Sequence, residues 1–400
     1  MLDHPEDIAR AGLCSGCGGC VVAAPDKIRM EIDRTGFFRP VVSSDLSDAE
    51  RLVVGSLCPG ISLEHQPSQD YLPAWGPVKS CWVGHASAED VRYVGSSGGV
   101  VTGTALYLLE TGQIDFVVHV RGSTTHALEN EVVFSRNRES LLGGAGSRYS
   151  PAAPAAAIPR ALAEPGRFAF IGKPCDVAAV RKMLDARPEL NARIPYLLSF
   201  MCAGTPSAHG TIEIIKKFSL DPAQVVEFRY RGRGWPGTTA ARTKDGAEAQ
   251  MDYNTAWGKI LNRHLQPRCK ICADGTGEFA DLVGADAWYG KDGYPDFAER
   301  DGRSLVIART LKGEGLLGNA AASGHLVVET FEPSQITPIQ PYQVKRKRSL
   351  LARLLALKVM QRRTPRYKGM HLWRLAVSAG PVENLKVFLG SVKRIAGNRL

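Results

Sequence analysis

The 400-residue chain has no run of eighteen consecutive apolar residues. A helix needs about 20 predominantly apolar residues to cross a bilayer, so the sequence predicts no membrane-spanning helix. The first seven residues, Met1–Asp7, include three acidic residues and no apolar stretch, unlike a secretory signal peptide. We therefore expect a cytoplasmic location, where thiols stay reduced and disulfides are rare.

Motifs of several common enzyme classes are also missing. The sequence has no Walker A loop, no Gly-x-Ser-x-Gly elbow and no set of protein-kinase motifs. Hydrolase chemistry therefore has no support. The nine histidines are scattered and form no His-x-x-x-His pair, so a histidine-based metal site is not predicted.

Cysteine is the informative residue type, because eight of the nine cysteines fall into two groups of four. The first thiol set comprises Cys14, Cys17, Cys20 and Cys58. The second thiol set comprises Cys175, Cys202, Cys269 and Cys272, and Cys81 remains outside both sets. Two sets of four thiols in one chain predict two metal centres.

The first thiol set begins with three cysteines spaced as in a bacterial ferredoxin. The fourth cysteine of the ferredoxin run is missing, because Ala24 stands in its place before Pro25. A two-cluster ferredoxin is therefore excluded, and Cys58, which precedes Pro59, becomes the expected remote fourth ligand. Zinc sites usually use two separated pairs, so the tight triplet favours an iron–sulfur cluster over zinc.

The second thiol set is interpreted through the fold that surrounds it. The sequence predicts a buried strand at 167–172, a helix at 173–184, a strand at 194–201 and a helix at 208–218. This order is typical of parallel strands in an α/β fold. Cys175 and Cys202 would then follow the carboxyl ends of strands, where open sheets bind ligands. They would also lie at helix N-termini, where the dipole lowers the pKa of a thiol.

Spacing alone leaves the role of the second set open. The C-x-x-C pair Cys269 and Cys272 could complete a four-thiol site from a loop. Alternatively, Cys175 and Cys202 are small buried residues, and the C-x-x-C pair is an isolated zinc or redox motif.

A Ser/Gly-rich turn, Gly95–Gly99, precedes a helix predicted at 100–110 and a strand predicted at 114–120. Its amides, hydroxyls and positive helix end suit a phosphate, although an ordinary serine cap has the same composition. Two further loops, Gly143–Ser150 and Arg229–Pro236, carry cations and aromatic residues. Each loop suits an anionic aromatic ligand such as a flavin dinucleotide, with a solvated loop as the alternative.

The net charge of +10 is concentrated near the C-terminal end. Residues 345–400 hold fifteen Lys or Arg and one acidic residue, which leaves about −4 for the rest of the chain. Apolar residues recur there at helical spacing, and Pro365 and Pro381 predict a division into two or three short helices. A basic amphipathic helix suits an anionic membrane surface, an acidic partner or the acidic remainder of the same chain.

In chain order, the motifs resemble those of the coenzyme F420 hydrogenase/dehydrogenase beta-subunit family. That family includes 7-hydroxymethyl chlorophyll a reductase and the ferredoxin-dependent divinyl reductases. The resemblance covers residues 10 to about 310 and does not reach the basic tail. The matching segments are Cys14–Cys20 with Cys58-Pro59, Gly95–Thr102, Ser147–Pro151, Gly172–Cys175, Phe200–Gly204, Arg268–Asp274, Ala280-Asp281 and Gly284–Trp288.

The resemblance implies an FAD enzyme with a [4Fe–4S] cluster on each of the two thiol sets. The Ser/Gly-rich turn would then bind the flavin phosphates, and either Lys173 or Arg148 near the flavin ring would favour its anionic reduced form. No residue is identified as catalytic. The implied cofactor-binding residues are Ser96, Ser97, Gly98, Gly99, Thr102, Ser147, Arg148, Tyr149 and Lys173.

Together these inferences predict an α/β iron–sulfur flavoprotein oxidoreductase in three parts. These are a ferredoxin-like iron–sulfur segment at 1–75, a flavin-binding and second-cluster domain at 76–340, and a basic helical tail at 341–400. The expected partners are ferredoxin or a similar one-electron donor, and either an organic substrate or coenzyme F420.

We also expect the tail to contact an acidic partner or the inner surface of the membrane. Nucleic-acid binding is not expected, because no nucleic-acid-binding motif accompanies the positive charge. Two other interpretations of the function remain. One is an electron-transfer subunit without a substrate site of its own. The other is a zinc-stabilised binding protein with a docking tail.

Overall fold

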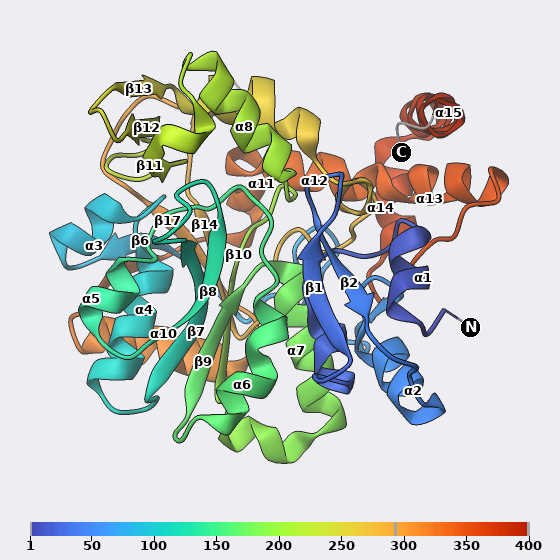
Figure 1. Cartoon of the computed structure of the whole chain (residues 1–400), viewed down its shortest axis with the longest axis horizontal. Coiled ribbons are helices and arrows are strands. Elements are labelled where there is room, and N and C mark those ends of the chain that lie inside the picture. Colours follow the sequence, from blue (N-terminus) through green and yellow to red (C-terminus); the bar gives the residue numbers. More distant parts are fainter. Residues whose placement is uncertain (1, 292–293, 398–400) are drawn as a thin grey trace.

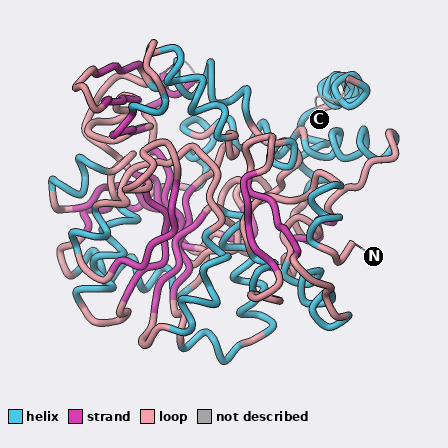
Figure 2. The backbone as a smooth tube through the Cα atoms, viewed as in Figure 1, coloured by secondary structure: helices cyan, strands magenta, loops and turns pink. Residues whose placement is uncertain are grey.

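The computed structural model describes residues 2–291 and 294–397. An eight-stranded mixed sheet lies at its centre, in the order β18–β6–β17–β14–β10–β9–β7–β8 (Figure 1, Figure 2). The strands β14, β10, β9 and β7 are parallel, and the strands outside them run antiparallel to their neighbours. The strands are β6 Ser80–Ala86, β7 Phe116–Gly122, β8 Asn130–Ser135, β9 Phe168–Gly172, β10 Tyr196–Phe200, β14 Leu282–Asp286, β17 Ser304–Ala308 and β18 Leu326–Thr330.

Helices cover both faces of the sheet, which explains why its parallel strands are apolar along nearly their whole length. In β9, Phe168 and Phe170 pack with residues of α7 (Pro174–Ala186). Ala169 faces the other way and packs with residues of α4 (Val100–Glu110) and α10 (Leu311–Ala322). Figure 1 shows α4 and α10 on one side of the sheet and α7 on the other. The α/β class and the predicted strand–helix–strand–helix order are confirmed.

The predicted bounds hold to within a few residues. The helix predicted at 100–110 is α4, and the one predicted at 208–218 is α8 (Ala208–Lys217). The strand predicted at 114–120 begins two residues later, as β7 (Phe116–Gly122). The reason is that the amides of Gln113 and Ile114 still donate to Leu108 O and close the end of α4.

A small antiparallel sheet of β11 (Val225–Arg229), β12 (Thr239–Thr243) and β13 (Glu248–Met251) lies near α8 (Figure 1). Its apolar face and α8 share one core, which includes Ile214 and Phe228. This sheet holds the 229–236 loop in place. Shorter elements are α3 Glu89–Val94, α5 Arg138–Leu142, α6 Ile158–Ala163, α9 Pro267–Lys270, β4 Tyr71–Leu72, β5 Gly76–Pro77, β15 Tyr289–Lys291 and β16 Tyr294–Asp296.

The N-terminal and C-terminal segments pack against each other. The first contains α1 (Pro5–Arg10), the hairpin of β1 (Ile28–Ile32) and β2 (Phe38–Val42), α2 (Asp48–Leu57) and β3 (Ser62–Glu64). The second contains α11 (Ile336–Ile339), α12 (Pro341–Arg348), α13 (Leu350–Val359), β19 (Arg366–Lys368), α14 (Leu372–Ala379) and α15 (Pro381–Ala396). β19 pairs in parallel with β3, and Leu350, Leu354 and Ile395 share a core with Ile8 and Leu13.

The tail thus differs from the two or three helices predicted for it. Pro365 precedes the added strand β19, and Pro381 begins α15, because proline suits the first turn of a helix. Docking on the same chain is the one predicted use of the tail that the structure shows. Across the described ranges, no helix is both long and apolar enough to cross a membrane. The three-part division at residues 75 and 340 stays a prediction.

Candidate functional site

The first thiol set comes together in the N-terminal segment. Cys14 and Cys17 lie on the loop that leads into the short helical turn Gly19–Ala23, and Cys20 lies within that turn. Cys58 caps the C-terminal end of α2. Burial raises the pKa of Cys20 well above its ordinary value, and charge on Cys17, Cys14 and Cys58 raises it further. A Cβ atom at Gly60, two residues after Cys58, would lie 2.4 Å from Leu13 O, and Cys14, Cys20 and Cys58 pack against the same apolar core. The remote cysteine therefore lies beside the triplet.

Glycines let the backbone of this loop turn its amides toward sulfur. The Gly16 amide donates to Cys14 Sγ at 3.3 Å, and the Gly19 amide donates to Cys17 Sγ at 3.4 Å. Gly18 has φ 84°, and a Cβ atom there would lie 2.7 Å from a neighbouring side chain. Amides aimed at sulfur stabilise negative charge on thiolates or on a cluster.

The second thiol set lines a single cavity of about 30 Å³. All four of its cysteines face this cavity, so the structure brings the C-x-x-C pair together with the cysteines that follow β9 and β10. The Gly204 amide donates to Cys202 Sγ and the Thr205 amide donates to Cys269 Sγ, each at 3.3 Å.

Two details of the prediction for this set are wrong. Cys175 lies in the first turn of α7, but Cys202 lies in the loop before α8, whose first residue is Ala208. The net pKa of Cys175 also does not fall below its ordinary value at this helix end. Burial raises that pKa well above its ordinary value, and Asp176 adds to the rise. The desolvation of a thiolate outweighs the modest stabilisation available at a helix N-terminus.

The two thiol sets are neighbours. Ser15 and Pro59, which are adjacent in sequence to cysteines of the first set, line the cavity of the second. Among residues 2–291 and 294–397, no three or more His, Cys, Asp or Glu side chains are grouped closely enough to hold a single metal ion. The described residues thus contain two adjoining sets of four thiols.

Buried donors without partners face the same cavity. Arg268 is only 4% exposed, and its Nη2 donates to Pro59 O at 3.0 Å. Its Nε and Nη1, and the Ser15 hydroxyl, have no hydrogen-bond partner within the described residues. Because unpaired buried donors are costly, a bound group that offers acceptor atoms fits here, as the sulfides of an iron–sulfur cluster would.

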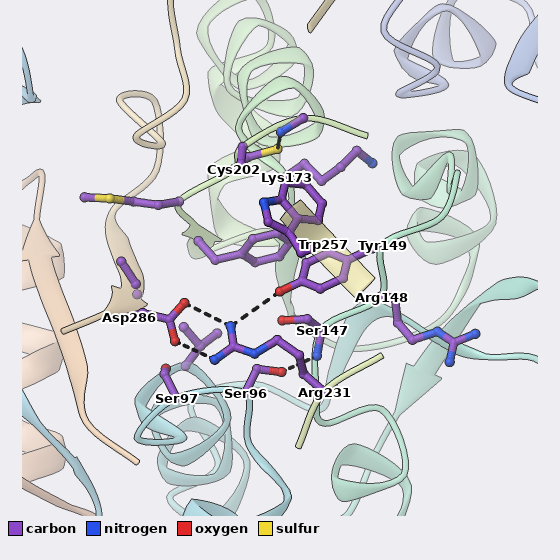
Figure 3. Close-up of a pocket in the computed structure, with 18 of the residues that line it drawn as sticks. Ser96, Ser97, Ser147, Arg148, Tyr149, Lys173, Cys202, Arg231, Trp257 and Asp286 are labelled. Atoms are coloured by element: carbon purple, nitrogen blue, oxygen red, sulfur yellow. Dashed lines mark hydrogen bonds and ion pairs between the residues drawn. The ribbon is translucent and has the colours of Figure 1, made fainter. Parts of the chain in front are cut away.

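A second cavity, of about 850 Å³, opens at the carboxyl edge of the parallel strands (Figure 3). Residues that follow β9 and β10 line it, and its volume falls within the roughly 300–1,000 Å³ of cofactor pockets. Among the predicted cofactor residues, Gly98 does not line it, because its amide is turned toward Ser304 Oγ at 2.9 Å. The predicted residues that line it are Ser96, Ser97, Gly99, Thr102, Ser147, Arg148, Tyr149 and Lys173.

The Ser/Gly-rich turn presents the start of α4 to this large cavity. Gly99 caps the helix with φ 74°, and a Cβ atom there would lie 2.7 Å from Val91 O. The Ser96 hydroxyl accepts a hydrogen bond from the Ser147 amide, which joins the turn to the 143–150 loop. The positive end of an eleven-residue helix and its free amides therefore face the cavity.

The two cations predicted to lie near a flavin ring already have partners in the protein. Arg148 donates to Asn130 Oδ1 at 2.7 Å and to Phe228 O at 3.0 Å, and Figure 3 shows it directed away from the other labelled residues. Lys173 Nζ lies 2.7 Å from Asp176 Oδ2. Both side chains therefore hold the cavity wall together.

The best-defined charged pair of the cavity was not among the predicted site residues. Arg231 donates to both carboxylate oxygens of Asp286, at 3.0 and 2.9 Å, and approaches the Tyr149 hydroxyl at 3.4 Å (Figure 3). Its guanidinium also lies over the rings of Tyr253 and Trp288. The composition of the 229–236 loop predicts a ligand-binding loop, but nothing in the sequence of that loop distinguishes Arg231 from its neighbours.

The C-terminal segment also reaches the cavity, which the sequence did not predict. Tyr342, Lys345 and Arg346 of α12 line one end of it. Cys202 and Arg346 line both the large cavity and the small one that the second thiol set surrounds. The two cavities are therefore adjacent.

Comparison with known proteins gives relatives that are redox enzymes by name. The chain is 25% identical over 328 residues to a coenzyme F420-dependent sulfite reductase of Methanocaldococcus jannaschii, covering 77% of this chain and 46% of the relative. It is 26% identical over 250 residues to an F420-dependent formate dehydrogenase 1 subunit beta of Methanococcus maripaludis, covering 62% and 61%. The chain thus spans about half to three-fifths of the length of these two proteins.

Another relative is matched over most of its length. This is a coenzyme F420 hydrogenase subunit beta of Methanothermobacter thermautotrophicus, 25% identical over 272 residues, with 66% of this chain and 88% of the relative covered. A chain of the F420-reducing [NiFe] hydrogenase complex from Methanosarcina barkeri shares the fold, with a TM-score of 0.53 and 20% identity over 71% of this chain and 95% of that one.

Two family profiles match consecutive parts of the chain. The N-terminal part of the coenzyme F420 hydrogenase/dehydrogenase beta subunit matches residues 81–158, and its C-terminal part matches residues 166–334. These ranges contain the Ser/Gly-rich turn, the whole second thiol set and the Arg231–Asp286 pair. The chain belongs to the coenzyme F420 hydrogenase/dehydrogenase beta-subunit family.

Proposed function

We propose that this chain is an iron–sulfur flavoprotein oxidoreductase with two [4Fe–4S] clusters and FAD. The first thiol set would hold one cluster, the second set would hold the other, and the large cavity would hold the flavin. Coenzyme F420 or an organic substrate would be the hydride partner, and a ferredoxin-like protein would be the one-electron donor. The names of the relatives favour coenzyme F420.

Both thiol sets have the chemistry that an iron–sulfur cluster requires. Each offers four sulfur ligands, and backbone amides in each already donate to sulfur. The unpaired donors of Arg268 and Ser15 lie where a cluster on the second set would offer acceptors. No disulfide joins any of the nine cysteines in the described residues, so the eight thiols of the two sets are available as ligands.

The large cavity has the features that a dinucleotide requires. The start of α4 provides amides and a positive dipole end for phosphate groups. The aromatic side chains of Tyr149 and Trp257 line the same space, and Arg231 is held there by Asp286. A bound flavin supplies the conversion between one-electron and two-electron chemistry.

The observation that carries the proposal is the shared wall of the two cavities. Cys202 and Arg346 line both of them, and the first thiol set adjoins the small cavity through Ser15 and Pro59. The first set, the second set and the flavin site would therefore follow one another without an intervening domain. Electron transfer between separate centres requires such proximity.

The proposal is tested by anaerobic purification followed by an absorbance spectrum and the quantitation of iron, sulfide and flavin. We expect about eight iron atoms and one flavin per chain, as two four-iron clusters and one FAD require. Cys175→Ala should lose about half of the iron and keep the flavin. The matched control is Cys81→Ala, because Cys81 is buried in β6 outside both sets. Equal iron in the two variants, or zinc in place of iron, would contradict the proposal.

A second candidate function is an electron-transfer subunit that serves a partner enzyme. The observation that favours it is that two of the relatives are named as subunits. A free-standing reductase should oxidise an artificial electron donor and reduce coenzyme F420 by itself. A subunit without its own substrate site should do so only after its partner is added.

The tail supports a further contact at the surface. On α15, Val382, Leu385 and Leu389 are exposed, and Lys386 and Lys393 lie on the same helix. Exposed apolar and basic side chains together suit an acidic partner or the anionic inner surface of a membrane. Sedimentation with phosphatidylglycerol vesicles separates the two cases, because only membrane contact carries the protein into the pellet, and Leu385→Glu should abolish it.

A further inference from the structure

Two buried guanidinium groups lie beside the second thiol set. Arg346, on α12, donates through Nη1 to Cys202 O at 2.8 Å and through Nη2 to Cys269 O at 3.0 Å. Arg268 comes directly before Cys269 and lines the same small cavity. The two side chains are 7% and 4% exposed, so water screens them poorly.

Neither guanidinium forms a direct ion pair with a carboxylate in the part of the chain that the structure describes. Lys173, by contrast, lies 2.7 Å from the carboxylate of Asp176. The carboxylate of Asp274 also lines the small cavity, where its Oδ1 accepts hydrogen bonds from the backbone amides of residues 276–278. The second thiol set therefore has two guanidinium groups and one carboxylate next to it, an excess of one positive charge.

Arg346 is also held firmly in place. Gln343, one turn earlier on α12, donates to the same Cys202 carbonyl at 3.2 Å. Gly275 leaves the room that this arrangement needs, because a Cβ atom there would lie 2.4 Å from Gln343 Oε1 and 2.9 Å from Arg346 Nη1. A cation fixed in this way cannot move away when the charge of the site changes.

A fixed positive charge favours the reduced form of a neighbouring redox centre. Reduction by one electron adds one negative charge to a cluster, and the attraction between that charge and a nearby cation is strong where the surroundings exclude water. Removing the cation should therefore lower the reduction potential. Replacing it with another cation should largely preserve the potential.

We propose that Arg346, which lies outside both matched family regions, raises the reduction potential of the cluster on the second thiol set. The inference rests on the function proposed above. It makes the C-terminal segment a component of the redox site in addition to its structural role. Arg346 acts through the electrostatic field at the cluster and through the two carbonyls it binds, so it is a positioning residue.

The test is a dithionite titration of the anaerobically purified holoprotein, with redox mediators and detection by electron paramagnetic resonance. The signal lost in Cys272→Ala identifies the cluster of the second set. In Arg346→Gln, we expect its reduction equilibrium to become at least tenfold less favourable, a shift of about 59 mV for a one-electron couple. The signal of the first set should stay within the error of the wild type.

Two further variants separate charge from other effects. Arg348→Gln removes an exposed arginine from the same helix and should leave both signals unchanged. Arg346→Lys keeps the charge and loses the paired hydrogen bonds, so its potential should stay closer to the wild-type value than that of Arg346→Gln. An equal shift in the lysine and glutamine variants would overturn the assignment to charge.

The remaining outcomes are also decisive. Unchanged potentials in Arg346→Gln with both clusters present would refute the inference and leave the proposed function standing. Absence of iron and sulfide from the wild-type protein would instead refute the proposed function. If Arg346→Gln does not retain its iron, Arg353→Gln replaces it, because Arg353 Nη1 donates to Lys270 O at 2.7 Å beside the same set. In Arg353→Gln, a downward shift of the reduction potential of the second cluster that is smaller than about 59 mV supports the inference, and an unchanged potential refutes it.

Discussion

Replacing Lys347 with methionine tests how the C-terminal segment is held. Lys347 Nζ lies 2.6 Å from Glu278 Oε1, and both side chains are almost completely buried. Glu278 also accepts a hydrogen bond from the Tyr71 hydroxyl at 2.7 Å. Burial alone would raise the pKa of Glu278, but Lys347 and His65 bring it well below its usual range. The carboxylate is therefore charged at neutral pH.

The expected cost follows from what the substitution leaves behind. Lys347→Met removes the ammonium and leaves a buried carboxylate without its main partner, which costs about 3–5 kcal/mol. A domain is typically stable by about 5–15 kcal/mol, so the loss is large. In the double variant Glu278→Gln, Lys347→Met, both charges of the pair are removed together and Tyr71 can still donate to the amide oxygen. Its loss should be smaller, about 1–2 kcal/mol.

The assay is urea unfolding followed by tryptophan fluorescence, arranged as a double-mutant cycle. The matched control is Lys368→Met, because Lys368 of β19 pairs with Glu64 of β3 at the surface between the same two segments. That change should cost far less. Because the pKa of Glu278 is depressed by folding, the advantage of wild type over the double variant should shrink as pH falls below about 4. A double variant as unstable as Lys347→Met would refute the reasoning.

Three further predictions concern the large cavity. Gly99→Ala should lower the flavin content of the purified protein, because a left-handed backbone costs alanine about 1–2 kcal/mol and the added Cβ atom would meet Val91 O. The control Gly112→Ala incurs only the backbone cost, because Gly112 has φ 66° and no atom within 4 Å of the added Cβ. Arg231→Lys breaks the paired bonds to Asp286 and should weaken flavin binding about tenfold in a fluorescence titration, unlike Arg233→Lys at an exposed position of the same loop. Burial lowers the pKa of His119 to about 4, below its value in the unfolded chain. The wild-type protein should therefore lose up to about 3 kcal/mol of stability as the pH falls from about 6.5 to 4. In thermal melts, His119→Gln should flatten that pH dependence.

The sequence predicted the fold well where local pattern and burial agree. The helix at 100–110 combines an apolar run with a glycine start and a Thr-Gly end, so its bounds follow from local chemistry. The parallel strands β9 and β10 were predictable because only strands covered on both faces are apolar throughout. The position of Cys202 in a loop was not predictable, because the number of residues between a strand and the next helix depends on tertiary packing.

The candidate site was predictable to the extent that its residues share a motif. The triplet of the first thiol set is a local signal, whereas the meeting of Cys175 and Cys202 with the C-x-x-C pair depends on the strand order. Arg231 and Asp286 are 55 residues apart, and Arg346 and Cys202 are 144 residues apart. The residues next to Arg231 and Arg346 in the sequence do not distinguish these two arginines from the many arginines on the surface.

The pairing of β19 with β3 has a consequence for how the protein is made. Residues 336–396 complete the core around residues 2–64, and Lys347, which binds Glu278, follows every strand of the central sheet in the sequence. During translation, the cysteines of both sets therefore remain open on one side after the central sheet has been synthesised. Delivery of iron and sulfide is easiest in that interval, before residues 336–396 fold over the site, and we expect maturation factors to act on the incompletely folded polypeptide.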